Sequence, residues 1–495
     1  MNNCVLRNVA PGELGAAADH LLSAGGRLQA VYAWFPKPDA PQLRYIATLP
    51  GRRAFESWRV EAGTQPVPSL AGKCPLLGWY EREAMEMSGV AFAGHPEPER
   101  LVTAFFPSME RGPLEPAEAT HASVAASLAA PTLPQVSGKH VQLLPFGPVR
   151  ADVVESAQFI FYYVGEGILH YHPNLFLKHR GMEKQFEGMD LEAGALLAER
   201  VSGVDSVAHA LAYVQAIEDA TDCVVPPRAR WLRVIAAELE RIYNHLHYLG
   251  HLCHTTTLKV GEAQGKLLEE RAKQMNALAS GSRFLRSIVW PGGVRRDLDV
   301  VAIAQSVTIL DRDLQRYVDL IERTTSHLDR LIATAPLSQQ IAYDQGATGP
   351  VERASGIDRD LRRDRPYAAY DELPPAVATR SEGDAYARMM VRIAELRASF
   401  GLLDDALARG IPAGPLLEPC PRAPNSEGLG WAESPRGTVI YALHLDDRSR
   451  ILRAKIKSPS FSNWRVFPFT VHDSNMMDYA INEASFGLTI AGCAR

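Results

Sequence analysis

The sequence has few cysteines, and none of them lie close together. Its six cysteines are Cys4, Cys74, Cys223, Cys253, Cys420 and Cys493, so no CxxC motif occurs in the chain. This spacing excludes the usual local signature of a zinc site or an iron–sulfur cluster. Scattered cysteines of this kind indicate buried, reduced thiols in a cytosolic protein.

Long apolar runs, a strong net charge and nucleotide-binding glycine motifs are missing as well. No segment reaches about 18 uninterrupted apolar residues, so no membrane span is expected. The start lacks the pattern of a secretory signal. A formal net charge of -5 over 495 residues argues against nucleic-acid binding. No GxGxxG follows a predicted strand, and the segment GEAQGKL at 261–267 is too short for a P-loop and lies in a helical pattern.

What remains is an ordinary globular composition, with 46% hydrophobic and 22% charged residues. In segment 1–113, apolar runs at 28–35 and 42–49 predict strands, and 11–24 predicts an amphipathic helix. We therefore expect a small α/β domain there. Residues 114–139 are rich in Pro, Ala, Ser and Thr, which is typical of a linker.

The segment 140–495 is predominantly helical, with β-rich pieces at 140–170 and 437–457. The apolar periodicity that predicts its helices runs through 190–220, 226–253, 264–287, 298–333 and 383–407. The expected fold class is α+β: a small N-terminal α/β domain followed by a large, mainly helical domain with peripheral strands.

Short strings in both segments resemble known families. Residues 78–96, GWYEREAMEMSGVAFAGHP, resemble the signature of the small hydrophilic subunit of respiratory complex I. The second segment contains further strings: HRGMEK from residue 179, ELERIYNH from 238, PGGV from 291, GPV from 349 followed by RASG, and ESPRG from 433. Together with 485–495, they resemble large subunits of energy-converting [NiFe] hydrogenases and the related quinone-site subunit of complex I. Each string alone is compatible with a turn or a solvated face, but their collinear order favours the family.

The resemblance identifies four positions where the hydrogenases bind nickel and iron through cysteine thiolates. They are occupied here by Ser202, Asp205, Thr489 and Gly492, and Cys493 lies one residue beyond the last of them. We call these four residues the ligand positions. Hydroxyls do not ionise near neutral pH and glycine offers no side-chain ligand, so the resemblance predicts a metal-free site without hydrogenase activity. A harder ion on Asp205 needs more carboxylates than these motifs supply.

Charged residues of the hydrogenase pattern are retained around the ligand positions. Arg200, His209 and Arg436 match that pattern, and with Asp205 they are the candidate residues of a vestigial cavity. The alternative is an ion-pair plug, in which Arg200 or Arg436 neutralises Asp205 and fills the space. Proton handling by Asp205 and His209 is a further hypothesis, since burial near charges can bring groups of these types into the range for proton transfer.

Two other candidate sites are weaker. The quinone-site subunit of complex I reduces quinone with a His and a Tyr, and Arg150 and Gly203 stand at the corresponding positions, which argues against that chemistry here. The residues His245, His247, His251 and His254 cluster on one predicted helix. The last three share a face that could bind a metal, although such faces are more often packed or hydrogen-bonded.

The resemblance implies a peripheral-arm subunit of a membrane-bound complex I-like or energy-converting-hydrogenase-related oxidoreductase, with a scaffold and coupling role. It implies no cofactor in this chain, an iron–sulfur cluster in a partner small subunit, and antiporter-like and other membrane subunits as further partners. The chain would then lie on the cytoplasmic side of the inner membrane, attached through these partners. Two alternatives stay open: a redox subunit acting on quinone or another small substrate in the vestigial cavity, and a standalone binding protein.

Overall fold

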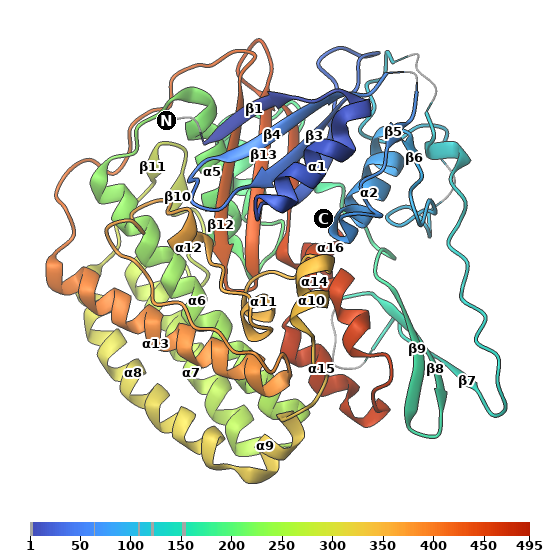
Figure 1. Ribbon diagram of the computed structural model, residues 1–495. Coiled ribbons are helices and arrows are strands. Elements are labelled where there is room, and N and C mark those ends of the chain that lie inside the picture. The colour runs from blue at the N-terminus through green and yellow to red at the C-terminus, as the bar shows by residue number, and fades with distance from the viewer. Residues whose placement is uncertain (1–2, 64, 107–108, 120–122, 151–154) are drawn as a thin grey trace.

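Strands from both ends of the chain gather at one end of the molecule, and long helices extend from there to the other end (Figure 1). The computed structural model describes residues 3–495 apart from 64, 107–108, 120–122 and 151–154. Among the helices of these residues, none combines the length with the apolar content that a membrane crossing requires. The predicted α+β class is confirmed.

The N-terminal segment forms a four-stranded sheet with the order β1-β4-β3-β2. Its strands are β1 (Cys4–Asn8), β2 (Arg27–Trp34), β3 (Gln42–Thr48) and β4 (Phe55–Glu61), with β1 parallel to β4 and the other pairs antiparallel. Helix α1 (Leu14–Ser23) buries Leu14, Ala17, Ala18 and Leu21, which is the spacing of one helical face. Helix α2 (Gly78–Ser88) carries the WYERE string. The strands and helices predicted here are confirmed.

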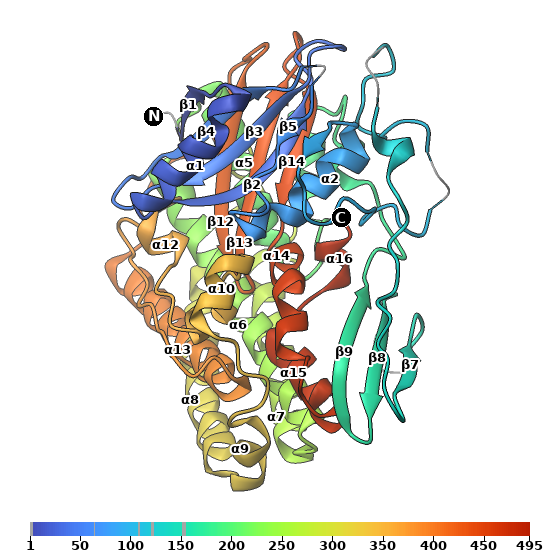
Figure 2. The same ribbon diagram turned by 45° about the vertical axis from the view of Figure 1, so that its right-hand side comes forward.

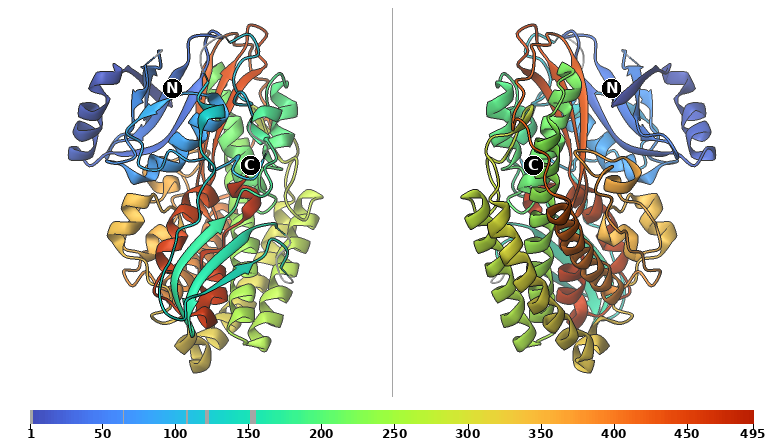
Figure 3. Two further views of the ribbon diagram at one scale, coloured as in Figure 1. Left: turned by 90° about the vertical axis from the view of Figure 1, so that its right-hand side faces the viewer. Right: turned by 90° about the vertical axis from the view of Figure 1, so that its left-hand side faces the viewer.

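Long helices form the other end of the molecule, where they lie side by side (Figure 3). They are α6 (Pro227–Thr255), α7 (Lys259–Ser280), α8 (Val300–Arg323) and α13 (Ala385–Arg409), whereas α5 (Ser206–Thr221) lies among the strands (Figure 1). The α6–α7 crossing is close because two glycines meet there: a Cβ on Gly265 would lie 2.6 Å from the Cα of Gly250. The predicted helical stretch 298–333 is divided at Thr324, where the backbone is extended between α8 and α9 (Thr325–Leu331).

A second sheet contains β12 (Glu427–Ser434), β13 (Gly437–Leu445) and β14 (Ile451–Lys457), all antiparallel. The hairpin predicted at 437–457 is therefore confirmed. Helix α5 lies directly on β12, where a Cβ on Gly428 or Gly430 would approach a helix carbonyl oxygen to 2.0 or 2.1 Å. Small residues on both elements permit this approach, and it holds the middle and the C-terminal half of α5 against the sheet.

Alanine at Gly430 is expected to destabilise the protein strongly. The added Cβ would lie 2.1 Å from the carbonyl oxygen of Ala212. Neither backbone can move freely, so we expect a loss of about 1–3 kcal/mol or more in the free energy of unfolding, measured by urea denaturation. The control Gly401→Ala adds a Cβ with nothing within 4 Å on α13. Equal stability of the two variants would contradict the close packing of α5 on β12.

The N-terminal sheet packs on the second sheet. Tyr32 Oη lies 3.1 Å from His444 Nε2, and the Trp34 and His444 rings stack with centroids 3.9 Å apart. Phe55 packs on Trp431. The segments 1–113 and 140–495 thus share hydrophobic cores, and their division into separate domains joined by 114–139 stays a prediction.

The strands β7 (Gln142–Phe146), β8 (Gln158–Val164) and β9 (Gly167–Asn174) form a sheet that stands at the side of the molecule (Figure 2). Short helices connect the larger elements. They are α3 (Met182–Gln185), α4 (Leu191–Ala198), α10 (Gln339–Gln345), α11 (Pro350–Ala354), α12 (Leu361–Asp364), α14 (Pro459–Val466), α15 (Tyr479–Phe486) and α16 (Ile490–Cys493).

Candidate functional site

Asp205 is the centre of a buried polar cluster at the start of α5. Its Oδ1 accepts a hydrogen bond from Arg436 Nη1 at 3.2 Å, and its Oδ2 accepts one from Ser202 Oγ at 3.1 Å. The Asp205 side chain is 2% exposed and that of Arg436 is 11% exposed. The structure therefore brings together two of the ligand positions and the predicted arginine, in the ion-paired arrangement.

Two arginines connect this cluster with the C-terminal string. Arg436 Nε donates to the carbonyl oxygen of Gly487 at 2.8 Å, and its Nη1 donates to Asn244 Oδ1 at 2.7 Å. Arg180 Nη2 donates to the carbonyl oxygens of Val201 and Ala491, at 2.5 and 2.6 Å. Strings far apart in the sequence, including HRGMEK, ELERIYNH and PRG, thus converge at the ligand positions.

His209 is buried on α5, one turn beyond Asp205. Its Nδ1 lies 3.0 Å from Tyr441 Oη, and its Nε2 has no hydrogen-bond partner in the described part of the chain. Burial lowers the pKa of His209 from 6.5 to about 4, and the nearby Asp205 charge opposes this only in part. The imidazole is therefore neutral at physiological pH.

Glu240, on α6, is a functional candidate that the sequence analysis missed. Its carboxyl oxygens accept hydrogen bonds from the backbone N–H groups of Val207 and Ala208 at 2.7 and 3.0 Å, at the first turn of α5. Burial, followed by the negative charge of Asp205, raises the pKa of Glu240 to about 8. Its place inside the ELERIYNH string is the signal that could have pointed to it.

The structure does not bring Arg200 to this cluster. Its side chain is 53% exposed, lies 3.9 Å from Glu199 Oε2, and donates to the carbonyl oxygen of Leu196 at the end of α4. Free carbonyl groups at a helix C-terminus attract a cation, which accounts for this position. Arg436 is thus the arginine that neutralises Asp205.

Hydroxyl groups lie at and around the other two ligand positions, Thr489 and Gly492. Thr489 Oγ1 accepts a hydrogen bond from the backbone N–H of Gly492 at 3.1 Å and lies 3.2 Å from Ser460 Oγ. A Cβ on Gly492 would lie 2.7 Å from Thr489 Oγ1, so a cysteine there would displace its neighbours. Cys493 is buried, and burial raises the pKa of its thiol, which keeps the thiol protonated.

This donor set does not fit a nickel–iron centre. Soft anionic sulfur is needed to bind both metals, and the ligand positions supply neutral hydroxyls and one carboxylate that Arg436 already neutralises. In the described residues, no group of three or more His, Cys, Asp or Glu side chains is arranged to hold a metal ion. We therefore derive no chemistry through a bound metal.

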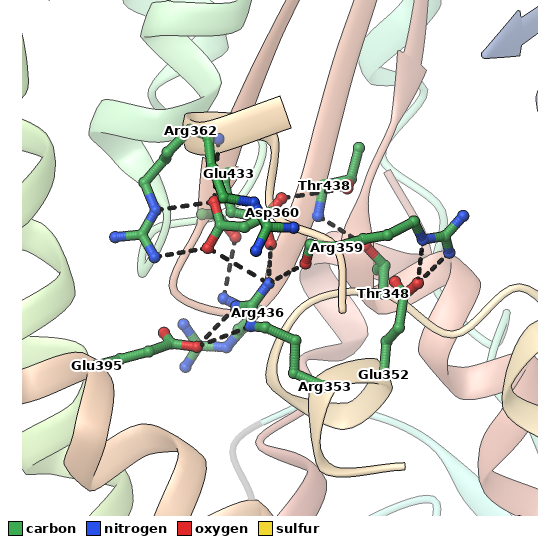
Figure 4. A network of polar contacts seen from close by, with 12 residues as sticks. Thr348, Glu352, Arg353, Arg359, Asp360, Arg362, Glu395, Glu433, Arg436 and Thr438 are labelled. Atoms are coloured by element: carbon green, nitrogen blue, oxygen red, sulfur yellow. Dashed lines mark hydrogen bonds and ion pairs between the residues drawn. The ribbon is translucent and has the colours of Figure 1, made fainter. Parts of the chain in front are cut away.

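A buried network of ion pairs lies beside the cluster, between α6, α11, α12, α13 and β12 (Figure 4). Arg353 is at its centre, with nitrogens 2.7 Å from Glu395, 3.0 Å from Glu433 and 3.5 Å from Asp360. Arg241 and Arg362 pair with Glu238 at 3.2 and 3.1 Å. These side chains are at most 2% exposed.

Carboxyl groups outnumber guanidinium groups in this network. Four carboxyl groups, those of Glu238, Asp360, Glu395 and Glu433, face three guanidinium groups. Burial and the charge of Asp360 raise the pKa of Glu433, whereas the Arg353 charge holds the pKa of Glu395 low.

A second buried network explains the WYERE and HRGMEK strings. Glu83 of α2 pairs with Arg495 and Lys455 at 2.8 and 2.5 Å, and Lys455 also pairs with Glu183 of α3 at 3.1 Å. The WYERE string lies in the N-terminal segment and the HRGMEK string lies in the second segment. Their acidic residues, Glu83 and Glu183, both pair with the buried Lys455, which anchors α2 to β14.

The weaker candidate sites have structural partners. Arg150 lies against Glu483, with two contacts of 2.9 Å, and Gly203 is exposed. His245 lies 2.8 Å from Glu395 in the buried network. The three other histidines of α6 stack along its surface, where His247 and His254 pair with glutamates of α7 at 3.1 and 3.0 Å.

Comparison with family models covers both segments of the chain. The model of the 49 kDa subunit of respiratory-chain NADH dehydrogenase matches residues 266–423 and 416–495, and that of the 30 kDa subunit matches 18–118. The nickel-dependent hydrogenase model matches 180–325. The membrane-bound sulfane sulfur reductase, an archaeal respiratory membrane complex, contains a chain with a similar fold: TM-score 0.69, 24% identity, 72% of this chain and 99% of that chain covered.

Curated relatives match most of the chain. Formate hydrogenlyase subunit 5 of Escherichia coli (strain K12) is 31% identical, over 85% of this chain and 75% of that protein. Hydrogenase-4 component G of the same organism is 31% identical, over 85% and 74%. The C/D subunit of NADH-quinone oxidoreductase from Ectopseudomonas mendocina (strain ymp) is 28% identical, over 87% and 80%. The chain therefore belongs to the family of [NiFe] hydrogenase large subunits and complex I 49 kDa subunits, joined to a 30 kDa-type segment.

Proposed function

We propose that this chain is a metal-free, peripheral-arm subunit of a membrane-bound oxidoreductase complex related to complex I and energy-converting hydrogenases. Its role there is to dock partner subunits and to couple charge or conformational changes between them. Relatives named as subunits of formate hydrogenlyase, hydrogenase-4 and NADH-quinone oxidoreductase support the assignment to such a complex. The expected partners are an iron–sulfur small subunit and antiporter-like membrane subunits, with the chain on the cytoplasmic side.

The ion pair between Arg436 and Asp205 carries this proposal. A cation 3.2 Å from the single carboxylate at the ligand positions supplies the charge compensation that a metal would otherwise provide. Removing a metal from an anionic site without such a replacement leaves a buried charge unpaired, which is strongly destabilising. The pair therefore favours a site that is stable without metal, and the buried networks around it favour a structural and coupling role.

Elemental analysis tests the metal-free part of the proposal. Chain purified from its native complex is expected to contain far less than one nickel per molecule, measured by inductively coupled plasma mass spectrometry. Nickel is the discriminating element because an iron–sulfur partner would contribute iron. One nickel per chain would contradict the proposal.

Replacing Asp205 with Asn or Ala tests the role of the cluster. If the role is scaffolding and coupling, an assembled complex carrying Asp205→Asn keeps its catalytic turnover, whereas turnover that depends on a reaction at Asp205 is lost. Native gel electrophoresis measures assembly separately, so a folding defect is not mistaken for a catalytic one. Lost turnover in a fully assembled complex would favour the alternative, a redox reaction in the vestigial cavity.

Gentle detergent extraction followed by affinity capture distinguishes the third possibility. We expect the chain to co-purify with an iron–sulfur subunit and with membrane subunits, identified by mass spectrometry. Recovery of the chain alone, as a monomer from the soluble fraction, would favour a standalone binding protein.

A further inference from the structure

Arg465, in the last turn of α14, is a largely buried cation whose charge is only partly offset by Glu97. Among the described residues, no hydrogen bond or ion pair reaches its guanidinium group, and its buried Nε has no partner. It lies against the first residue of α2, where a Cβ on Gly78 would be 2.9 Å from Arg465 Nη1. Burial lowers the pKa of Arg465 to about 10, and the charge of Glu97 opposes this only in part, so Arg465 still carries its charge at neutral pH. A desolvated charge in this state attracts an anion.

Arg465 lines an open pocket with a volume of about 320 Å³ between α2, the end of β9, α10 and the segment after α14. This volume is in the range of small-molecule sites. Four aromatic residues contribute to its wall: Trp79, Phe105, Phe176 and Phe469. Trp79 and Phe176 pack edge to face, with ring centroids 6.1 Å apart, whereas Phe105 and Phe469 are 45% and 46% exposed.

The charges that line the pocket are mainly positive. Arg82, Arg100 and Arg465 contribute three cations, and Glu97 is the single carboxylate among the described lining residues. Glu97 lies 3.4 Å from Arg82, is 66% exposed and also attracts Arg465. One carboxylate therefore faces three cations, and Arg465 remains only partly compensated beside an aromatic wall.

We propose that this pocket binds a small organic anion, with its carboxylate, sulfonate or phosphate group on Arg465 and a flat apolar body against Trp79 and Phe105. A guanidinium group with unused N–H donors recognises such head groups through paired hydrogen bonds. Exposed aromatic side chains gain by covering a flat body. This site is separate from the Asp205 cluster and does not depend on the function proposed for that cluster.

The chemistry of the pocket favours an organic anion over an inorganic one. An inorganic phosphate ion would use Arg465 and leave the aromatic wall exposed. An acidic side chain of a partner protein is the main competing occupant, since it too would present a carboxylate to this arginine. Competition by phosphate and probe binding in the assembled complex distinguish these two occupants from a small organic anion.

Two fluorescent probes of similar shape test the proposal: anionic 1-anilinonaphthalene-8-sulfonate and the neutral N-phenyl-1-naphthylamine. The full-length protein is titrated with each probe, as wild type, Arg465→Gln, Phe105→Ala and the control Arg312→Gln, whose side chain is 63% exposed on α8. We expect Arg465→Gln to raise the Kd of the anionic probe about tenfold or more and to leave that of the neutral probe unchanged. Phe105→Ala should weaken both probes, and Arg312→Gln neither.

The thermal midpoint of Arg465→Gln checks the premise that this cation takes part in no structural ion pair. Removing a buried charge without a contacting partner should keep or raise the midpoint, whereas loss of a structural ion pair lowers it. A lower midpoint, or equal effects of Arg465→Gln on both probes, would overturn the proposal. Competition by inorganic phosphate at concentrations as low as those of the anionic probe would assign the site to an inorganic anion.

The assembled complex provides the last comparison. Arg465-dependent binding of the anionic probe should persist when the partner proteins are present. If it occurs in the isolated chain and disappears on assembly, a partner's acidic group occupies the pocket and the small-ligand proposal is wrong.

Discussion

Replacing Arg353 with methionine is expected to lower the free energy of unfolding by about 3–5 kcal/mol. Arg353 pairs with Glu395, Glu433 and Asp360 in the buried network, and its side chain is fully buried. Methionine fills a similar space but leaves these carboxylates without their central cation. Breaking a buried ion pair from one side is costly because the remaining charge is neither hydrated nor compensated. Urea denaturation followed by circular dichroism measures the loss.

The control for this prediction is Arg312→Met on the surface of α8. Arg312 is 63% exposed and lies 3.7 Å from Asp313, so the change should be within about 0.5 kcal/mol. If the two variants are equally stable, the buried network does not contribute to stability in the way we infer.

Replacing Glu240 with glutamine is expected to remove a large pH dependence from the stability. The pKa of Glu240 is raised from 4.5 to about 8 by burial and by Asp205, so the folded state favours its protonated form. Such a group stabilises the folded state fully below its unfolded pKa, and this contribution is lost as the pH rises through the folded pKa. Between pH 4.5 and 8, the wild type should lose about 3–5 kcal/mol that Glu240→Gln does not lose.

The comparison is made by denaturant unfolding of both proteins at several pH values from 5 to 9. Glutamine cannot accept both backbone hydrogen bonds at the start of α5, so its curve carries a constant offset. The difference in slope is therefore the relevant quantity. Because the Asp205 charge contributes to the raised pKa, Asp205→Asn should move the wild-type transition to lower pH. Parallel curves for wild type and Glu240→Gln would refute the raised pKa.

Local patterns were sufficient for much of the fold. The strands β2 and β3, helix α1 and the β13–β14 hairpin were predicted because alternation, helical periodicity and turn residues are visible within short windows. The boundary between α8 and α9 was missed, because apolar periodicity continues across Thr324 while the backbone turns there. Loop geometry of this kind depends on packing, which a short window does not contain.

The candidate site was predicted in part. The resemblance brought Asp205 and Arg436 together as a possible ion pair, and the structure has that pair at 3.2 Å. It also placed Arg200 in the cavity, whereas that side chain lies at the surface on the end of α4. A motif gives the position of a residue along the chain, but the direction of a side chain is decided by which partner is within reach.

The sequence by itself determined which chemical groups are available: no paired cysteines, hydroxyls and one carboxylate at the ligand positions, and arginines and glutamates within the collinear strings. Tertiary structure alone decided which of these groups meet. Glu240 meets α5 and Arg353 meets three carboxylates, because α6 and α11 bring together residues that lie far apart in the sequence. In a buried environment these pairings set each charge and pKa, so they also determine what the site can do.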